Sequence, residues 1–525
     1  MPEPTPAPPA RFDAASFTGR RLRLGITDDG RAWPSWVQRV VAELAAHLRL
    51  EVGRIPSALI RPEAPSQSLV RQWFDRLDQR RLTSWLATRG INESPAALPE
   101  LPCWTATDAA ADVIWYLGTP ASGLALPQAP FGVWHYRDDD AIHDVFAGKP
   151  VTEAVLLASQ GHTTHVLGKT EARVHSSSPA ITAFQRDEAG ARLMLDALER
   201  LMHQAWSPAA FGEHDVSASA SDQTRAPSNV GMMWQLLSRW LPRVLAARRK
   251  SSTRAQWTVG IAPLASEREP GQIRLDQISW LTPPPDSFVA DPFLWKHEGQ
   301  WHVFAEVMPF ASGKGHLAVC TWDANHGFGP LKTVLCEDTH LSYPFLFEHE
   351  GRHYLMPEQY NGGELCAYEC VEFPHRWERA RPVKAGLRCA DATLLQHEGR
   401  WWLFYTAVHG GASEDSLYAC FADTPFGPWQ PHPSNPLSSG LRGSRMAGGF
   451  ITKSDGRLLR PAQEASACYG GATILFEVEM LTPHDYRERE VAFIDPAVFP
   501  PPWNERCHTW NEHEGMVVFD ACRSL

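Results

Sequence analysis

Five segments repeat one pattern, a turn with glycine followed by a mostly apolar run: HEGQWHVFAE (297–306), HEGRHYLMPE (349–358), HEGRWWLFYT (397–406), SDGRLLRPAQ (454–463) and HEGMVVFDAC (513–522). Their glycines are separated by 52, 48, 57 and 59 residues, which fits one four-stranded blade per repeat. Strand-like segments such as DPFLWK (291–296) precede the turns, so each repeat centres on a β-hairpin. The sequence therefore predicts an all-β, five-bladed β-propeller over residues 256–525.

The open ends of these hairpins are expected to carry the functional residues. Residues equally distant from a hairpin turn lie side by side. The predicted pairs are Asp291 with Glu306, Tyr343 with Glu358, and Asp391 with Thr406. If the hairpins are the inner strands of their blades, these ends converge around the propeller axis. The fourth repeat then adds Arg445 and Gln463, and the fifth adds His508.

Three carboxylates at matching repeat positions, Asp291, Glu358 and Asp391, are the predicted catalytic group. Like charges placed together are costly unless function requires them. The predicted substrate-binding residues are Glu306, His340, Tyr343, Arg445, Arg460, Gln463, Tyr469 and His508. Structural alternatives remain open, because an Asp that opens a strand is as often a turn residue. The two arginines could pair with the acids or hold a phosphate.

The first half of the chain predicts a mostly parallel α/β domain over residues 19–206. Apolar strands are expected at 21–27 and 112–118, and helices at 34–50, 67–86 and 187–204. A proline-rich, disordered tail is expected over 1–18 and an exposed linker over 207–230.

An amphipathic helix is expected over 231–255, with its apolar positions in 232–250, an interruption at Pro242 and a basic carboxy-terminal end. One interpretation is a helix that packs on the protein, with its cations complementing the helix dipole. The other is peripheral contact with an anionic membrane, with Trp234 and Trp240 as anchors.

The net charge and the motif content of the chain argue against several classes of function. The net charge of −11 argues against nucleic-acid binding, and no spacing of Cys, His or acidic residues requires a metal. No Walker or dinucleotide motif occurs, so no cofactor can be assigned. Without a signal-peptide pattern or an apolar run of about 18 residues, we expect a cytoplasmic protein, at most peripheral to the inner membrane face.

Several motifs of the second half resemble one known family. ADPFLW, SYPFLF, ADATLL and RPAQ, with YGGA (469–472) and HTWN (508–511), resemble the propeller domain of glucosamine inositolphosphorylceramide transferase and its bacterial relatives over about residues 257–525. This resemblance implies sugar transfer to a glycolipid. More distantly, the propeller is similar to glycoside hydrolases of the arabinanase and xylosidase type. That similarity implies Asp291 as base, Asp391 as the residue that tunes its pKa, and Glu358 as acid.

Residues 20–204 resemble the formyltransferase fold, through GVWHYRDDD (132–140) and GKPVTEAVLL (148–157). The Asn of the family's Asn-x-His pattern is replaced by Val133, although His135 is retained. The resemblance therefore implies a Rossmann-type domain without formyl transfer, one that binds, docks or completes a site.

Three functions follow as hypotheses. The first is a transferase of glycan or glycolipid biosynthesis, in which Asp291 deprotonates an acceptor hydroxyl and Arg445 or Arg460 neutralises a phosphate of the substrate. The second is a glycoside hydrolase with the same acids. The third is a non-catalytic carbohydrate-binding or scaffolding protein.

Overall fold

The computed structural model describes residues 21–28, 33–46, 49–56, 68–88, 100–104, 111–117, 129–137, 140–160, 163–203, 228–250, 254–266, 268–359, 364–408 and 414–525. The chain divides into two compact units, Met1–Leu245 and Ala246–Leu525. The predicted tail and most of the predicted linker lie outside the described residues. Each unit is considered by itself.

The first unit is built on a six-stranded sheet. Its strands are β1 (Leu22–Asp28), β2 (Leu50–Pro56), β3 (Val113–Trp115), β4 (Val133–Tyr136), β5 (Val151–Gln160) and β6 (Thr163–Arg173), in the order β2-β1-β3-β4-β5-β6. The first four strands in this order are parallel, and β5 and β6 are antiparallel to their neighbours. The predicted α/β class is therefore confirmed, in a mixed sheet.

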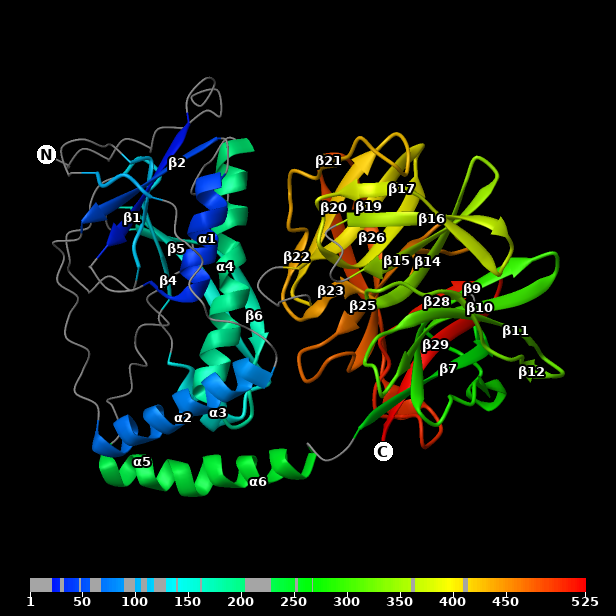
Figure 1. Ribbon diagram of the computed structural model, residues 1–525, viewed down its shortest axis with the longest axis horizontal. Helices are drawn as coiled ribbons and strands as arrows, with labels where there is room; N and C mark the ends of the chain where they lie inside the picture. Colours follow the sequence, from blue (N-terminus) through cyan, green and yellow to red (C-terminus); the bar gives the residue numbers. More distant parts are fainter. Residues whose placement is uncertain are drawn as a thin grey trace, which may run out of the picture. The chain divides into compact units, whose positions relative to one another are not determined.

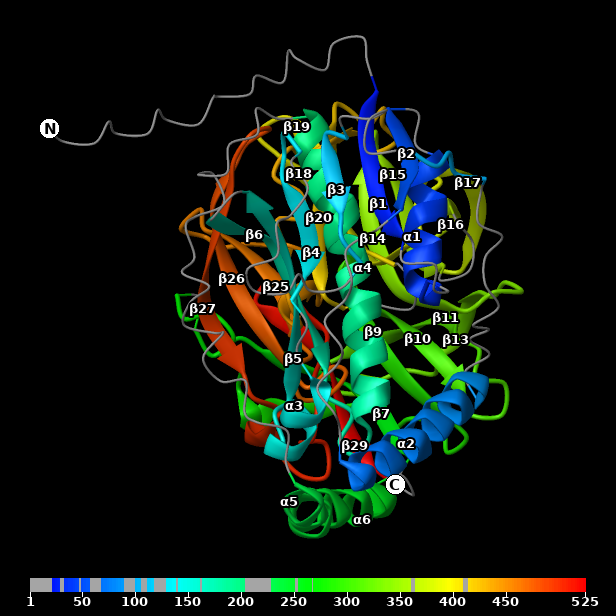
Figure 2. The ribbon, with the colours of Figure 1, turned by 90° about the vertical axis from the view of Figure 1, so that its left-hand side faces the viewer.

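Helices of this unit are α1 (Ser35–Ala46), α2 (Leu69–Thr88), α3 (Ala141–Ala147) and α4 (Pro179–His203). Figures 1 and 2 show α1 and α4 beside each other against the sheet, and apolar side chains of both join its core. The helix predicted over 34–50 ends earlier, since the chain from Leu50 pairs with β1 as a strand. The predicted helix 187–204 begins earlier, because the Ser178 hydroxyl accepts the Ile181 N–H and Pro179 fits the first turn.

The formyltransferase resemblance stays a prediction. His135 lies buried on β4, with its Nε2 3.1 Å from the Ser159 hydroxyl. Burial lowers the pKa of His135, which favours the neutral imidazole. Residues 138–139 and 161–162, which belong to the quoted motifs, lie outside the described residues.

The amphipathic helix is one continuous helical run. It comprises α5 (Asn229–Gln235), a π-helical turn (Leu236–Trp240) and α6 (Leu241–Lys250). The predicted interruption at Pro242 is absent, since α6 continues through this residue. Proline cannot donate a backbone hydrogen bond, and the turn before it is wound as a π-helix, with the Leu241 N–H bonded to the Leu236 carbonyl. None of the helices in the described ranges combines the length and the apolar character needed to span a bilayer.

The second unit is a five-bladed β-propeller, as predicted. Four blades follow one another along the chain. They are β9 (Ser287–His297) to β13 (Lys332–Leu335); β14 (Leu341–His349) to β17 (Arg376–Ala385); β18 (Cys389–His397) to β22 (Ser438–Ser439); and β23 (Arg442–Met446) to β27 (Tyr486–Ile494). Their second strands are β10 (Gln300–Pro309), β15 (Arg352–Gln359), β19 (Arg400–Ala407) and β25 (Leu458–Glu464), which follows the short β24 (Ile451–Thr452).

The fifth blade combines strands from the beginning and from the end of the second unit, which closes the ring of blades. Its order is β28-β29-β7-β8, formed by β28 (Trp510–His513), β29 (Met516–Ser524), β7 (Ala255–Pro263) and β8 (Ser279–Trp280). Strand β29 pairs with β7 along its whole length. The first strand of each blade contacts the first strand of the next, so these strands form the inner ring.

The hairpin turns confirm the repeat. In four blades, two residues join the inner strand to the second strand, and both have positive φ, as in Glu298 (48°) and Gly299 (80°). Such turns suit the twist of paired strands. The fourth blade departs from this rule, since its inner strand is split into β23 and β24 around Gly448.

Candidate active site

Three predicted site residues occupy the same unusual position in three blades. Asp291, Tyr343 and Asp391 have φ values of 50°, 46° and 48°, a left-handed conformation that non-glycine residues rarely adopt. Each begins a β-bulge, where two residues of the inner strand face one residue of the second strand. Strained positions of this kind cluster at functional sites.

The bulges correct the predicted pairing by one residue. Directly opposite Glu306, Glu358 and Thr406 stand Ala290, Ser342 and Ala390. The extra residue in each bulge turns the Asp or Tyr side chain out of the regular ladder. As a result these side chains hydrogen-bond to neighbouring blades.

Side chains from all five blades converge at this end of the inner strands. Asp291 accepts the Tyr343 N–H at 3.1 Å, and Asp391 donates its own N–H to Glu358 at 2.9 Å. We call this group the axial site. It consists of Asp291, Glu306, Tyr343, Glu358, Asp391, Arg445, Gln463, His508 and Asp520, each less than one tenth exposed.

A guanidinium organises one half of the axial site. Arg445 donates to both oxygens of Asp391, from Nε at 2.6 Å and from Nη2 at 3.1 Å. Gln463 Nε2 donates to the same carboxylate at 2.9 Å, and the Glu358 carboxyl lies 3.5 Å from Arg445. The two hydrogen bonds with Asp391 therefore fix the orientation of Arg445.

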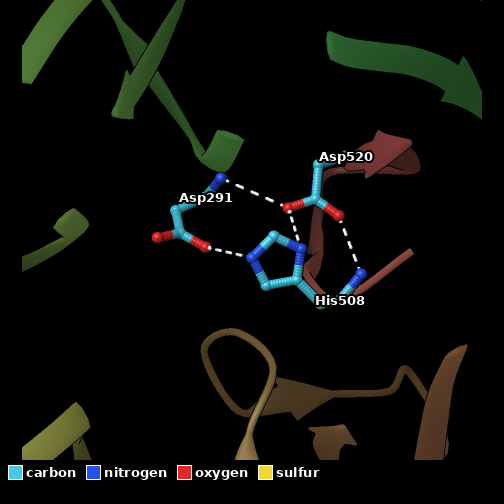
Figure 3. A group of neighbouring side chains, drawn as sticks. All are labelled: Asp291, His508 and Asp520. Atoms are coloured by element: carbon cyan, nitrogen blue, oxygen red, sulfur yellow. Dashed lines mark hydrogen bonds and ion pairs between the residues drawn. The ribbon is translucent and has the colours of Figure 1, made fainter. Parts of the chain in front are cut away.

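An imidazole organises the other half (Figure 3). His508 lies between two carboxylates, with Nε2 3.1 Å from Asp291 Oδ1 and Nδ1 2.9 Å from Asp520 Oδ2. Asp520 also accepts the backbone N–H groups of His508 and Thr509. Although burial opposes a charge on His508, Asp520 and Asp291 outweigh it, so the pKa of His508 lies well above its ordinary value.

Among the described residues, Asp291, His508 and Asp520 form a group whose possible ligand atoms lie close enough together to hold a metal ion. The fit is poor, because the imidazole stands between the carboxylates, with one ring nitrogen within ion-pair distance of each. A metal would have to displace both of these contacts. We therefore describe Asp291, His508 and Asp520 as an ion-pair triad.

The pKa values of the carboxyl groups in the axial site are shifted in opposite directions. Burial would raise the pKa of Asp291, but hydrogen bonds and charge from His508 and the Thr509 hydroxyl lower it below its usual value. Burial and the neighbouring Asp291 raise the pKa of Glu306 well above its usual value. Burial and Asp391 likewise raise the pKa of Glu358. The site thus combines an aspartate whose pKa is lowered with two glutamates whose pKa values are raised.

His340 and Tyr469 are the solvent-facing members of the predicted set. His340 Nδ1 accepts the Gly315 N–H at 2.9 Å, which leaves the proton on Nε2, 3.4 Å from Glu306 Oε1. Tyr469 is 37% exposed, and its ring lies near both the Arg445 guanidinium, at 5.4 Å, and the His508 ring, at 5.3 Å. Solvent therefore reaches these two members of the predicted set more than it reaches the residues of the axial site.

Tyr343 supports the site from within. Its hydroxyl accepts the Gly448 N–H at 3.0 Å and lies 2.8 Å from the Thr393 hydroxyl. Gly448 has a φ of 141°, and a Cβ at this position would stand 2.3 Å from the Trp510 carbonyl. Tyr343 therefore joins blades two, three and four instead of presenting its hydroxyl to a ligand.

Arg460 is a wrong prediction. Its guanidinium is fully buried against Glu488, with two hydrogen bonds of 2.7 Å, and donates to the Gly443 carbonyl. Side chains alternate across a strand, so residues three apart point to opposite faces. Since Gln463 faces the axial site, Arg460 on the same strand faces away from it.

Two functional residues were missed from the sequence. Asp520 holds His508, and the Thr509 hydroxyl donates to Asp291 at 3.0 Å. A signal for Asp520 exists in the repeats, because it stands seven residues after the turn histidine, where the other blades carry Phe304, Met356 and Phe404. An acid at an otherwise apolar repeat position indicates a specific role.

A separate cavity lies nearer the hairpin turns, at the other end of the inner strands. Its volume is about 270 Å³, and aromatic side chains such as Phe345 and Phe450 line much of it. None of the carboxyl groups of the axial site lines this cavity.

Residues 278–511 match the family described as "Glucosamine inositolphosphorylceramide transferase 1, N-terminal". Curated relatives with the name glucosamine inositolphosphorylceramide transferase 1 are 34% identical over 209 residues in Oryza sativa subsp. japonica and 35% identical over 215 residues in Arabidopsis thaliana. These stretches cover 39% and 40% of this chain. The chain spans 28% of the length of each relative.

Among solved structures, an alpha-L-arabinofuranosidase from Podospora anserina is similar at 12% identity, with a TM-score of 0.34. The likeness covers 45% of this chain and 90% of that chain. Because the score is low, the propeller assignment rests on the strand pairing of this chain.

Proposed function

We propose that this chain is an enzyme of glycan or glycolipid biosynthesis, which transfers a sugar or a related group at the axial site. The observation that carries the proposal is the pair of buried carboxyl groups with opposite pKa shifts, Asp291 lowered and Glu306 raised. Environments that push two carboxyl pKa values apart are typical of acid–base pairs in sugar chemistry. The names of the relatives support transfer and a glycolipid acceptor.

Glu306 is the preferred proton-transfer group. A group that exchanges a proton with a hydroxyl near neutral pH works best when its own pKa lies near that pH. The low pKa of Asp291 makes it a weak base, and hydrogen bonds hold both of its oxygens. We therefore move the proton-transfer role, predicted for Asp291 as base, to Glu306, whose raised pKa suits an acid that protonates the leaving oxygen and then recovers a proton from the acceptor hydroxyl. Asp291 then stabilises positive charge that develops on the sugar.

Glu358 and Asp391 have supporting roles in this proposal. Glu358 accepts the Asp391 N–H and lies near Arg445, so its carboxyl has less freedom than that of Glu306. Asp391 keeps Arg445 in place. The exposed Tyr469 ring offers a surface on which a sugar could stack.

Both arginines that were predicted to bind a phosphate of the substrate are paired with carboxylates. Arg460 is paired with Glu488, and Arg445 is held by Asp391. Binding a phosphate at Arg445 would have to compete with a bidentate, buried ion pair. We propose instead that the axial site binds sugar hydroxyl groups, for which its carboxyl groups are suitable hydrogen-bond partners.

A transfer assay tests the proposal. The full chain is incubated with a total lipid extract and each member of a panel of radiolabelled nucleotide sugars, and label in the lipid fraction is measured. We expect one donor to label a lipid in proportion to protein concentration. Absence of labelled lipid with every donor, alongside saturable sugar binding measured by NMR, would favour the non-catalytic alternative.

A glycoside hydrolase is the second candidate. It is favoured by the same observation, because hydrolysis also needs one ionised carboxylate and one protonated carboxyl group. Release of reducing sugar from arabinan or xylan oligosaccharides, without label transfer to lipid, would support hydrolysis over transfer.

A further inference from the structure

The helical run from α5 to α6 is firmly attached to the first unit along one side. Met232 and Leu236 are buried in a cluster that contains Phe74 of α2 and Val145 of α3. Arg243 donates to the carbonyl of Val145 at 2.8 Å, at the carboxy-terminal end of α3. The run is therefore a fixed helix whose outer side is determined by this attachment.

Trp240 belongs to the attached side, contrary to the prediction that it anchors the protein to a membrane. Its indole Nε1 donates to the Ser177 carbonyl at 2.7 Å, and its ring meets the Phe74 ring edge-on at 5.4 Å. The Arg81 guanidinium lies over the Trp240 ring, 4.7 Å from the ring centroid. These contacts leave Trp234 as the exposed tryptophan of the run.

The outer side of the run carries an unbroken set of exposed apolar side chains, which we call the apolar stripe. It consists of Val230, Met233, Trp234, Leu237, Leu241 and Leu245. Steps of three and four residues place them on one face of a helix. Trp234 is 71% exposed and Val230 is 81% exposed. Scattered apolar residues are normal on a surface, but a continuous stripe of this kind marks an interaction site.

The neighbouring helix α2 adds to the exposed apolar surface. Figures 1 and 2 show α2 beside α5, and the Val70 N–H donates to the Asn229 side chain at 3.1 Å. On α2, Leu69 is 74% exposed and Trp73 is 58% exposed. Arg76 and Arg80 are also exposed, one and two turns further along this helix.

Charge identifies the kind of partner. Between Asn229 and Lys250 the sequence contains five Arg or Lys residues and no Asp or Glu, within a chain of net charge −11. A tryptophan-bearing apolar stripe on a helical run whose sequence carries cations and no anions fits the surface of an anionic bilayer. A second copy of the chain fits poorly, since pairing two such faces would bring like charges together.

We propose that the apolar stripe rests on an anionic membrane surface, with Trp234 inserted at the level of the headgroups. This contact does not depend on the reaction at the axial site. It would serve any activity of the chain on a membrane lipid.

Co-sedimentation of the full chain with vesicles tests the proposal. Vesicles of phosphatidylcholine with phosphatidylglycerol are compared with vesicles of phosphatidylcholine alone. We expect at least tenfold tighter binding to the anionic vesicles, because basic residues near the surface add to apolar insertion, and weaker binding as salt is raised. Equal binding to both vesicles, or none to either, would overturn the proposal.

Variants locate the contact. The double substitution Trp234→Ser with Leu237→Ser removes the centre of the stripe and should weaken anionic binding at least tenfold. As a matched control, Val371→Ser with Val498→Ser changes two valines of the second unit that are 50% and 55% exposed, and should leave binding unchanged.

Since all four side chains are exposed, both variants should keep the wild-type melting temperature. Unchanged binding in the stripe variant would contradict the proposal. So would concentration-dependent dimerisation of the wild type that the stripe variant abolishes, because this would identify a second copy as the partner.

Discussion

The two halves of the axial site differ in the cation that neutralises their aspartate. Asp391 is held by the guanidinium of Arg445, whereas Asp291 is held by the imidazole of His508. A guanidinium stays charged at every accessible pH, but an imidazole can lose its proton. We therefore expect the Asp391 half to be a constant support and the Asp291 half, which also contains Glu306, to respond to pH.

Substitution of Arg445 should have the largest effect. Arg445→Met leaves Asp391 and Glu358 buried without their cation, which should cost about 3–5 kcal/mol in the free energy of unfolding. Urea denaturation measures this loss. Arg442→Met on the same strand is the matched control, because its ion pairs with Glu464 and Glu490 are partly exposed and should matter by no more than about 1 kcal/mol. Similar losses in both variants would refute the role of Arg445 as the central support.

Substitution of His508 should have a smaller effect that depends on pH. Because the folded-state pKa of His508 is raised, its stabilising contribution is fully present below its unfolded value, about 6.5, and disappears as pH rises through the folded value. His508→Gln should lose about 2–3 kcal/mol below pH 6.5. The gap between wild type and variant should narrow at high pH. A gap that widens between pH 6 and pH 9 would show that the imidazole is neutral in the folded protein.

Glu306→Gln should change the slope of stability against pH more than stability itself. A carboxyl group that keeps its proton in the folded state lowers stability as pH rises above its unfolded pKa, about 4.3. Replacing Glu306 should remove a slope of up to about 1.4 kcal/mol per pH unit above that value. Unfolding of wild type and variant at pH 5, 6 and 7 measures the difference. Parallel curves would mean that Glu306 is ionised when folded.

The repeats allowed the number of blades and most of the axial site to be predicted, because a hairpin's turn fixes which residues share its open end. The bulges were not predictable in the same way, since a left-handed Asp or Tyr leaves no mark in the sequence. They moved Asp291 and Tyr343 out of the expected pairing. Strand alternation places Arg460 on the opposite face from Gln463, and Asp520 differs from the apolar residues that the other blades carry at its repeat position.

In the first unit, residue patterns predicted elements better than boundaries. The apolar periodicity of α1 runs on into β2, so strand pairing with β1 decides where the helix ends. The helix from Asn229 to Lys250 was expected, but which of its tryptophans faces outward depends on the contacts of Trp240 with Phe74 and Ser177.

The transfer rate of Glu306→Gln tests the central claim most directly. With the donor found for the wild type, and with the fold of the variant checked by its unfolding curve, label transfer to lipid is measured at neutral pH. The account predicts a loss of about 10²–10⁴-fold, the usual contribution of a positioned acid–base group. A Glu306→Gln variant that is folded and transfers sugar at the wild-type rate would contradict it.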